Sequence, residues 1–187
     1  GQATLGLELL EDLPDLTTAV IPLGGGGLLG GTAMALKLQN PNVRVIGVQT
    51  EAVSPYLGYI QSGNYTPIQP NANTIADGIK VKLPGAANSA IIRRYVDDVV
   101  TVDDNQISEA IVALLERTRT IGEGAGAVAL AAMIHKKVPL GPNEKVAVVI
   151  SGGNIDSILV GRIIDVGLVS SGRYVSVAVT VPDTPGT

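Results

Sequence analysis

Apolar residues recur at two spacings along this chain, and segments of the two kinds alternate. Four short, nearly continuous apolar runs are typical of strands buried on both faces: residues 19–23, 43–48, 96–102 and 145–150. Longer segments with apolar residues three or four positions apart predict helices: residues 3–10, 32–38, 103–119, 125–137 and 155–166. The alternation predicts an α/β fold with an open, mostly parallel sheet and helices on both faces.

Three segments fall outside this alternation. Residues 53–62 are compatible with a further helix, and residues 63–90, rich in Asn, Pro and Gly, predict a long irregular excursion. Residues 173–181 alternate as a strand does and lead into a turn-like end. A strand without a partner is incomplete structure, and the chain begins at Gly1 without a Met or a signal peptide. We therefore expect a segment of a longer protein.

Composition and charge narrow the classes of partner. The net charge of −4, without a cluster of Lys or Arg, argues against a nucleic-acid surface. No stretch approaches the roughly 20 consecutive apolar residues of a membrane span. The absence of Cys excludes disulfides and thiolate metal sites, and the single histidine, His135, leaves no histidine cluster for zinc. We expect a small-molecule partner, with no nucleic acid, no membrane and no metal.

A run of glycines, GGGGLLGG at residues 24–31, lies between the first predicted strand and the helix predicted over residues 32–38. Residues without a Cβ let the backbone approach an anion closely, and the N-terminus of the following helix adds a positive dipole. These features favour a phosphate-binding turn. The alternative is a glycine cluster that serves tight packing only.

A second alternative is a dinucleotide-binding domain of the NAD type. Gly25, Gly27 and Gly30 satisfy the pattern G-x-G-x-x-G, and Glu51 lies about twenty residues further on, after the next strand. The pattern alone is weakly specific, and four consecutive glycines exceed what a pyrophosphate turn requires. The run lacks the Gly-Lys-Ser/Thr ending of a nucleoside-triphosphatase phosphate loop.

Three further motifs are candidates for the same site. Ser151 opens the sequence SGGN after the last buried strand, so its hydroxyl is expected in the crevice that the glycine run borders. The alternative is that Ser151 or Asn154 caps the next helix. Glu123 precedes GAGA and could simply place an acid at a helix start, and Asp77 beside Gly78 could simply be a turn residue.

Together, these motifs resemble the pyridoxal-phosphate-dependent threonine and serine dehydratases, or ammonia-lyases, over nearly the whole chain. The matching segments are GQAT at residue 1, IPLGGGGL at 21–28, TIADG at 74–78, EGAGA at 123–127 and SGGN at 151–154. The resemblance implies the tryptophan-synthase-β-like fold, pyridoxal-phosphate fold type II, here incomplete. It assigns the cofactor phosphate to Gly24, Gly25, Gly26, Gly27 and Leu28, and the pyridine nitrogen to Ser151. Glu123 and Asp77 are expected near the site without an assigned role.

The resemblance also implies a function and a domain division. Residues 1–170 would be part of the large catalytic domain, and residues 171–187 the start of a truncated ACT-like regulatory domain. The parent protein would convert L-threonine, or L-serine, to a 2-oxo acid and ammonia, in amino-acid metabolism such as isoleucine biosynthesis. A hydroxyl at the ring nitrogen, in place of a carboxylate, suits such an elimination. A cytoplasmic homo-oligomer is expected.

The chain departs from the family in two respects. The family's Schiff-base lysine sits in a Ser-Phe-Lys-type motif upstream of the glycine run, and this chain has no Phe and no lysine in such a motif. The chain alone is therefore predicted to be inactive and to hold no catalytic residue. Some relatives bind a divalent cation through acids at positions that Gln49 and Pro55 occupy here. A non-catalytic regulatory remnant is the third alternative.

Overall fold

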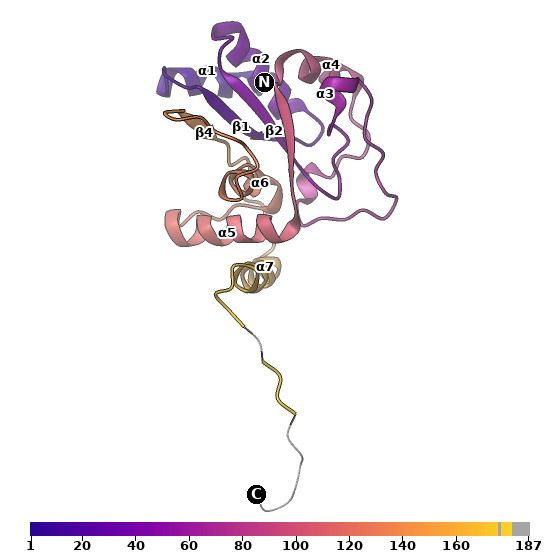
Figure 1. Ribbon diagram of the computed structural model, residues 1–187, viewed down its shortest axis with the longest axis vertical. Coiled ribbons are helices and arrows are strands. Elements are labelled where there is room, and N and C mark those ends of the chain that lie inside the picture. The colour runs from indigo at the N-terminus through magenta and orange to yellow at the C-terminus, as the bar shows by residue number, and fades with distance from the viewer. Residues whose placement is uncertain (176, 181–187) are drawn as a thin grey trace, which may run out of the picture.

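The computed structural model describes residues 1–175 and 177–180. Its centre is a parallel sheet of four strands in the order β3-β2-β1-β4 (Figure 1). The strands are β1 (Thr18–Pro22), β2 (Arg44–Thr50), β3 (Asp98–Val102) and β4 (Val146–Val148). Each begins and ends within two residues of an apolar run, so the predicted parallel α/β sheet is confirmed.

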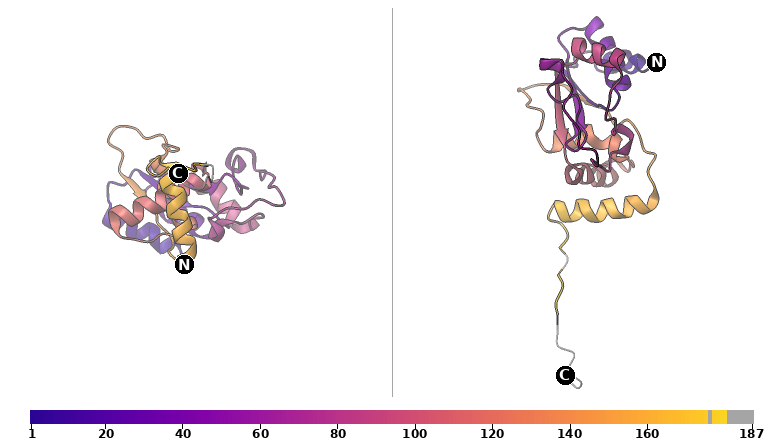
Figure 2. Two further views of the ribbon diagram at one scale, coloured as in Figure 1. Left: turned by 90° about the horizontal axis from the view of Figure 1, so that it is seen from below. Right: turned by 90° about the vertical axis from the view of Figure 1, so that its right-hand side faces the viewer.

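Helices cover both faces of the sheet, because successive residues of a strand point to opposite sides. Ala19 and Ile21 of β1 pack into one apolar cluster with α1, α2 and α4, whereas Val20 packs into another with α5, α6 and α7. α7 contacts α5 and forms the outermost layer (Figures 1 and 2). The helices are α1 (Ala3–Asp12), α2 (Gly27–Gln39), α4 (Ala86–Tyr95), α5 (Asp104–Thr118), α6 (Gly124–Ile134) and α7 (Ser157–Ser170).

The strand order places a topological switch point between β1 and β4. β2 and β3 follow on one side of β1, whereas β4, the last strand in the chain, pairs with the other side of β1. In open α/β sheets, ligands bind in the crevice outside the carboxyl ends of the strands at such a reversal. The glycine run follows β1 and Ser151 follows β4, so both candidate turns border this crevice.

The largest differences from the predicted helices lie in residues 53–95. Only α3 (Tyr59–Ser62) forms within residues 53–62, because Gly58, at φ +78°, leaves the preceding residues in turns. The excursion at 63–90 holds the short 3-10 helix η1 (Asp77–Ile79) and the start of α4. The prediction missed α4 because this helix begins inside the segment that is rich in Asn, Pro and Gly, and it packs against α2 through the buried Ile92.

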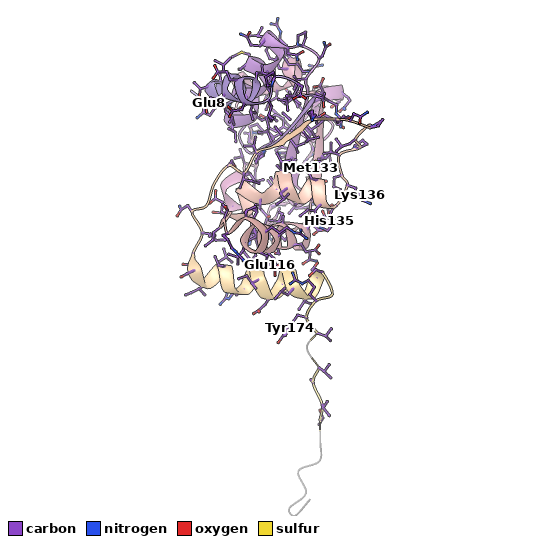
Figure 3. All side chains as sticks on the ribbon, turned by 90° about the vertical axis from the view of Figure 1, so that its left-hand side faces the viewer. Glu8, Glu116, Met133, His135, Lys136 and Tyr174 are labelled. Atoms are coloured by element: carbon purple, nitrogen blue, oxygen red, sulfur yellow. The ribbon has the colours of Figure 1, made fainter. Side chains whose placement is uncertain are left out.

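A capping box opens α5, whereas the predicted C-terminal strand is wrong for the described residues. Asp103 and Gln106 exchange side-chain to backbone hydrogen bonds at the start of α5. Beyond α7, residues 174, 175 and 177–180 are not in a strand. Val175, Val177 and Val179 are about three-quarters exposed, since no neighbouring strand within the described chain pairs with them (Figure 2). Tyr174 marks where this segment leaves α7 (Figure 3).

The predicted turn at 182–187 lies outside the described residues, and the division at residue 170 stays a prediction. No helix in the described part of the chain is long and apolar enough to span a membrane.

Candidate functional site

The glycine run forms the passage from β1 to α2. The Leu23 N–H still donates to the Val48 carbonyl at 2.8 Å, and the Gly30 N–H makes a helical hydrogen bond to the Gly26 carbonyl at 2.9 Å. α2 therefore begins at Gly27, inside the glycine run, and not at residue 32 as predicted. Its first N–H groups have no intrahelical partner, and no described side chain caps them. The turn thus presents backbone donors and the positive end of a helix dipole.

Packing explains two of the four consecutive glycines. Gly26 has φ +89°, and a Cβ there would lie 2.6 Å from Cδ1 of Ile92. A Cβ at Gly24 would lie 3.0 Å from the Cα of Ile79 in η1. A Cβ at Gly27, in contrast, would meet no described atom within 4 Å. Tight packing therefore does not account for the whole run.

A cavity of about 380 Å³ lies against this turn and brings the predicted motifs together. Its lining comes from the glycine turn, η1, the start of α6 and the turn after β4. The lining residues are Pro22, Gly24, Gly25, Gly26, Gly27, Leu28, Gly78, Ile79, Glu123, Ala125 and Ser151. All six residues assigned to the cofactor thus line one cavity. None of the lining residues is a lysine.

Ser151 is not a helix cap. The N-cap of α7 is Asp156, whose side chain accepts a 2.7 Å hydrogen bond from the N–H of Ile158. The alternative that Ser151 or Asn154 caps this helix is therefore wrong, because a better acceptor stands directly before the first helical turn. The Ser151 side chain is exposed toward the cavity and hydrogen-bonds to no described residue, which leaves its hydroxyl available to a ligand.

The EGAGA and SGGN motifs interlock. The Glu123 N–H donates a 3.0 Å hydrogen bond to the Gly152 carbonyl. A Cβ at Gly126 would lie 2.5 Å from that same oxygen. Glu123 does occupy the N-cap position of α6, but its side chain makes no capping hydrogen bond. Its carboxylate instead borders the cavity.

The TIADG motif is anchored by a residue that the sequence analysis missed. Asp104 accepts hydrogen bonds from the Thr74 hydroxyl at 2.6 Å and from the Ile75 N–H at 3.1 Å. This places Gly78 in the cavity lining, whereas the Asp77 side chain is 89% exposed and outside it. The sequence does place an acidic residue, Asp104, directly after the capping residue Asp103. No local pattern, however, links Asp104 to Thr74, which lies 30 residues earlier in the chain.

Gln49 supports the glycine turn. Its fully buried amide donates to the Leu23 carbonyl at 3.3 Å and accepts from the Tyr56 N–H at 2.9 Å. Glu51, which the dinucleotide alternative requires, pairs with Lys137 at 3.6 Å and is outside the cavity lining. Within the described residues no group of three or more metal-ligating side chains occurs.

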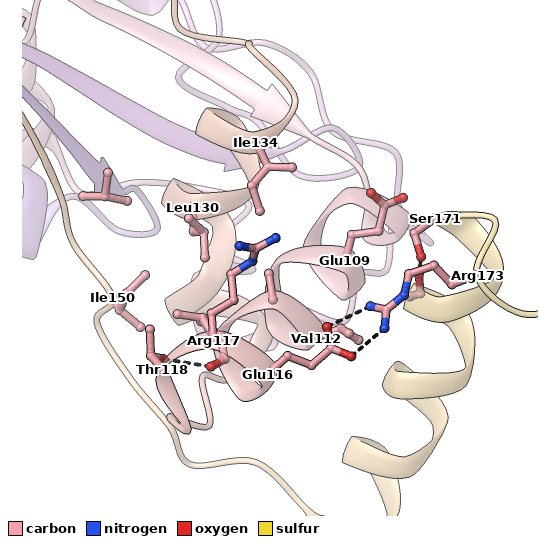
Figure 4. A pocket seen from close by; sticks show the side chains of 14 residues that line it. Glu109, Val112, Glu116, Arg117, Thr118, Leu130, Ile134, Ile150, Ser171 and Arg173 are labelled. Carbon is pink, nitrogen blue, oxygen red and sulfur yellow. Dashed lines mark hydrogen bonds and ion pairs between the residues drawn. The ribbon is translucent and has the colours of Figure 1, made fainter.

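A larger cavity, of about 520 Å³, lies between α5, α6, α7 and β4, and its walls are mostly apolar (Figure 4). At its rim, Arg173 donates two hydrogen bonds to Glu116, at 2.8 and 2.9 Å. This contact lowers the pKa of Glu116 and raises that of Arg173. No candidate motif contributes to this cavity, so the smaller one is the candidate site.

The chain matches characterised proteins over all or most of its length. Over 186 residues it is 47% identical to an L-threonine ammonia-lyase of Thermotoga maritima, covering 100% of this chain and 46% of that protein. Among solved structures, processed threonine deaminase isoform 2 of Solanum lycopersicum has a TM-score of 0.80 at 31% identity, covering 90% of this chain and 47% of that one. Maize serine racemase has a TM-score of 0.78 at 31% identity, covering 91% and 53%.

The chain spans about half the length of the curated relatives it matches. The comparisons give no support to the dinucleotide-binding alternative or to the non-catalytic remnant. The family model described as "Pyridoxal-phosphate dependent enzyme" matches residues 1–152. The architecture is that of fold type II, as predicted, and the chain belongs to the family of pyridoxal-phosphate-dependent enzymes.

Proposed function

We propose that the protein carrying this chain is a pyridoxal-phosphate-dependent ammonia-lyase that converts L-threonine, and also L-serine, to the 2-oxo acid and ammonia. For L-threonine the net products are 2-oxobutanoate and one ammonia, which together hold all the atoms of the substrate. The names of the relatives support threonine as the substrate. One methyl group in an apolar pocket discriminates by only about 1–3 kcal/mol, which is why serine is included.

The observation that carries this proposal is the pairing of an uncapped helix N-terminus with a free hydroxyl across one cavity. The residues fit the cofactor: the first N–H groups of α2 suit its phosphate, and the Ser151 hydroxyl suits a ring nitrogen. In this proposal, residues 24–28 hold the phosphate through backbone donors. When bound, pyridoxal phosphate supplies the electron sink for deprotonation at the substrate α-carbon.

Ser151 sets the charge of the ring nitrogen in this proposal. A hydroxyl neither demands nor supplies a full proton there, whereas a carboxylate would stabilise the protonated ring. The elements that hold Ser151 are the Gly152 carbonyl contact with Glu123 and the close approach of Gly126. The lysine that forms the covalent link to the cofactor would come from outside these 187 residues.

The test is an assay of 2-oxobutanoate formation from L-threonine by the protein that carries this chain. Activity should require pyridoxal phosphate. Ser151→Ala should lower kcat by about 5- to 150-fold. The ring nitrogen of the bound cofactor would lose its hydrogen-bond partner, and an unpaired polar group in a closed site costs about 1–3 kcal/mol. Ser157→Ala, at an exposed position in the same segment, is the matched control and should be neutral. Activity without the cofactor, or none with it, would contradict the proposal. Homo-oligomerisation and a cytoplasmic location stay predictions.

A further inference from the structure

Asn88 contacts the glycine turn from outside the cavity. Its side-chain amide, on α4, donates a 2.9 Å hydrogen bond to the carbonyl oxygen of Gly25. The two residues are 63 positions apart, and Asn88 is not among the residues that line the cavity. The contact therefore acts on the turn without touching a ligand in it.

The hydrogen bond to the Gly25 carbonyl also fixes the direction of the N–H of Gly26, which belongs to the same peptide unit. In a trans peptide the C=O of one residue and the N–H of the next point in opposite directions, and the described chain has no cis peptide. With the Gly25 carbonyl directed at Asn88, the N–H of Gly26 is directed away from α4. Because both residues of this peptide are glycines, rotation of the peptide plane is sterically easy without an external contact.

α4 is a rigid support for this contact. Ser89, the neighbour of Asn88, accepts a 2.6 Å hydrogen bond from the Tyr65 hydroxyl and lies 3.0 Å from the Tyr56 hydroxyl. Tyr56 is fully buried, and its burial raises the pKa of the phenol. Ile92, one turn along the helix, packs where a side chain at Gly26 would be. Asn88 is thus held by the same helix surface that closes over the turn.

We infer that Asn88 is a positioning residue for the phosphate-binding turn, which holds the Gly25–Gly26 peptide so that its N–H serves the anion. This inference rests on the proposed function, because it assumes that a phosphate binds at the turn. Its physical basis is preorganisation: a donor already oriented costs no ordering when the ligand arrives. The role is specific to the phosphate and leaves the ring contact at Ser151 unaffected.

The test compares the affinities of the protein that carries this chain for pyridoxal phosphate and for pyridoxal, which lacks the phosphate. Asn88→Ala should weaken pyridoxal phosphate about tenfold, or about 1.4 kcal/mol, and leave pyridoxal unchanged. Asn88→Asp keeps the size of the side chain but removes the donor, so it should weaken pyridoxal phosphate at least as much. The inhibition constant of inorganic phosphate, measured in competition with pyridoxal phosphate, should be higher in both variants than in the wild type.

Ala87→Gly is the matched control, because it weakens the same helix at an exposed position beside Asn88 without removing a hydrogen bond to the turn or to its support. It should lower the melting temperature while keeping the wild-type ratio of the two affinities. If Asn88→Ala weakens both ligands equally, or neither, the inference is overturned. A wild-type protein that binds pyridoxal as tightly as pyridoxal phosphate would instead overturn the proposed function, and the inference with it.

Discussion

The Glu123 N–H and the Gly152 carbonyl form a 3.0 Å hydrogen bond that joins the start of α6 to the turn after β4. This bond links residues that are 29 positions apart in the chain, and it holds Ser151 in the lining of the cavity that the glycine turn also borders. The close approach requires a glycine at position 126, since a Cβ there would lie 2.5 Å from the Gly152 oxygen. The site is therefore assembled by backbone packing between loops.

Gly126→Ala should destabilise the protein by about 1–3 kcal/mol, because the added methyl group forces the Gly152 backbone away. The free energy of unfolding from urea titration measures the change. Gly161→Ala in α7 is the control, since a Cβ there meets no described atom within 4 Å. That control should be stabilising by about 0.5–1 kcal/mol, as expected for Gly to Ala in a helix. Equal effects of the two substitutions would contradict the packing account.

Two glycines of the turn should respond differently to substitution. Gly26→Ala should cost roughly 1–2 kcal/mol for the left-handed backbone alone, and further for the contact with Ile92. Gly27→Ala, with open space around it, should change the unfolding free energy by less than about 0.5 kcal/mol. Thermal unfolding of the two variants side by side is the measurement. A stable Gly26→Ala variant would show that the positive φ is not required.

Asp104→Ala should release the segment that carries Gly78. The Thr74 hydroxyl and the Ile75 N–H both lose their acceptor, which should cost about 1–3 kcal/mol. Hydrogen exchange of the Ile75 amide should become faster. Asn105→Ala, exposed at the next position, should be neutral to within about 0.5 kcal/mol. Unchanged exchange at Ile75 would mean that Asp104 does not hold this segment.

Glu144 should make stability depend on pH in the acid range. Hydrogen bonds from the Thr18 hydroxyl, at 2.6 Å, and from the Gly141 N–H lower the pKa of Glu144 below its usual 4.5. A carboxylate with a lowered folded-state pKa stabilises the fold above the unfolded pKa, and the contribution is lost as pH falls through the folded value. The wild type should therefore be more stable than Glu144→Gln near neutral pH. This difference in unfolding free energy should reach its maximum there and vanish in acid.

Denaturant titrations across the acid range measure that difference. Glu8→Gln in α1 is the control, because the Glu8 side chain is exposed (Figure 3) and makes no hydrogen bond or ion pair with the described residues. A difference between wild type and Glu144→Gln that persists in strong acid would contradict the account.

The sheet and the two candidate turns could be predicted because local patterns encode them. Buried parallel strands are nearly continuous apolar runs, and the parallel order places every loop after a strand at one edge. That geometry alone brings the turn after β1 and Ser151 after β4 to the same crevice.

The supports of the site could not be predicted in this way. Three supporting residues each form a hydrogen bond with a segment at least 26 residues away in the chain: Asn88, Gln49 and Asp104. The sequence around each of them does not indicate which segment it contacts. α4 was missed for a different reason: it begins within a segment rich in Asn, Pro and Gly, which predicts irregular structure, and its contact with α2 is not visible in the local sequence.

The central claim is that residues 24–28 hold the phosphate of pyridoxal phosphate while Ser151 faces its ring nitrogen. An experimental structure of the protein with this cofactor bound tests it most directly. The account predicts backbone N–H groups of the glycine turn within hydrogen-bonding distance of the phosphate oxygens, and the Ser151 Oγ beside the ring nitrogen. A phosphate bound away from the turn, or a ring nitrogen facing the Glu123 carboxylate instead of Ser151, would contradict it.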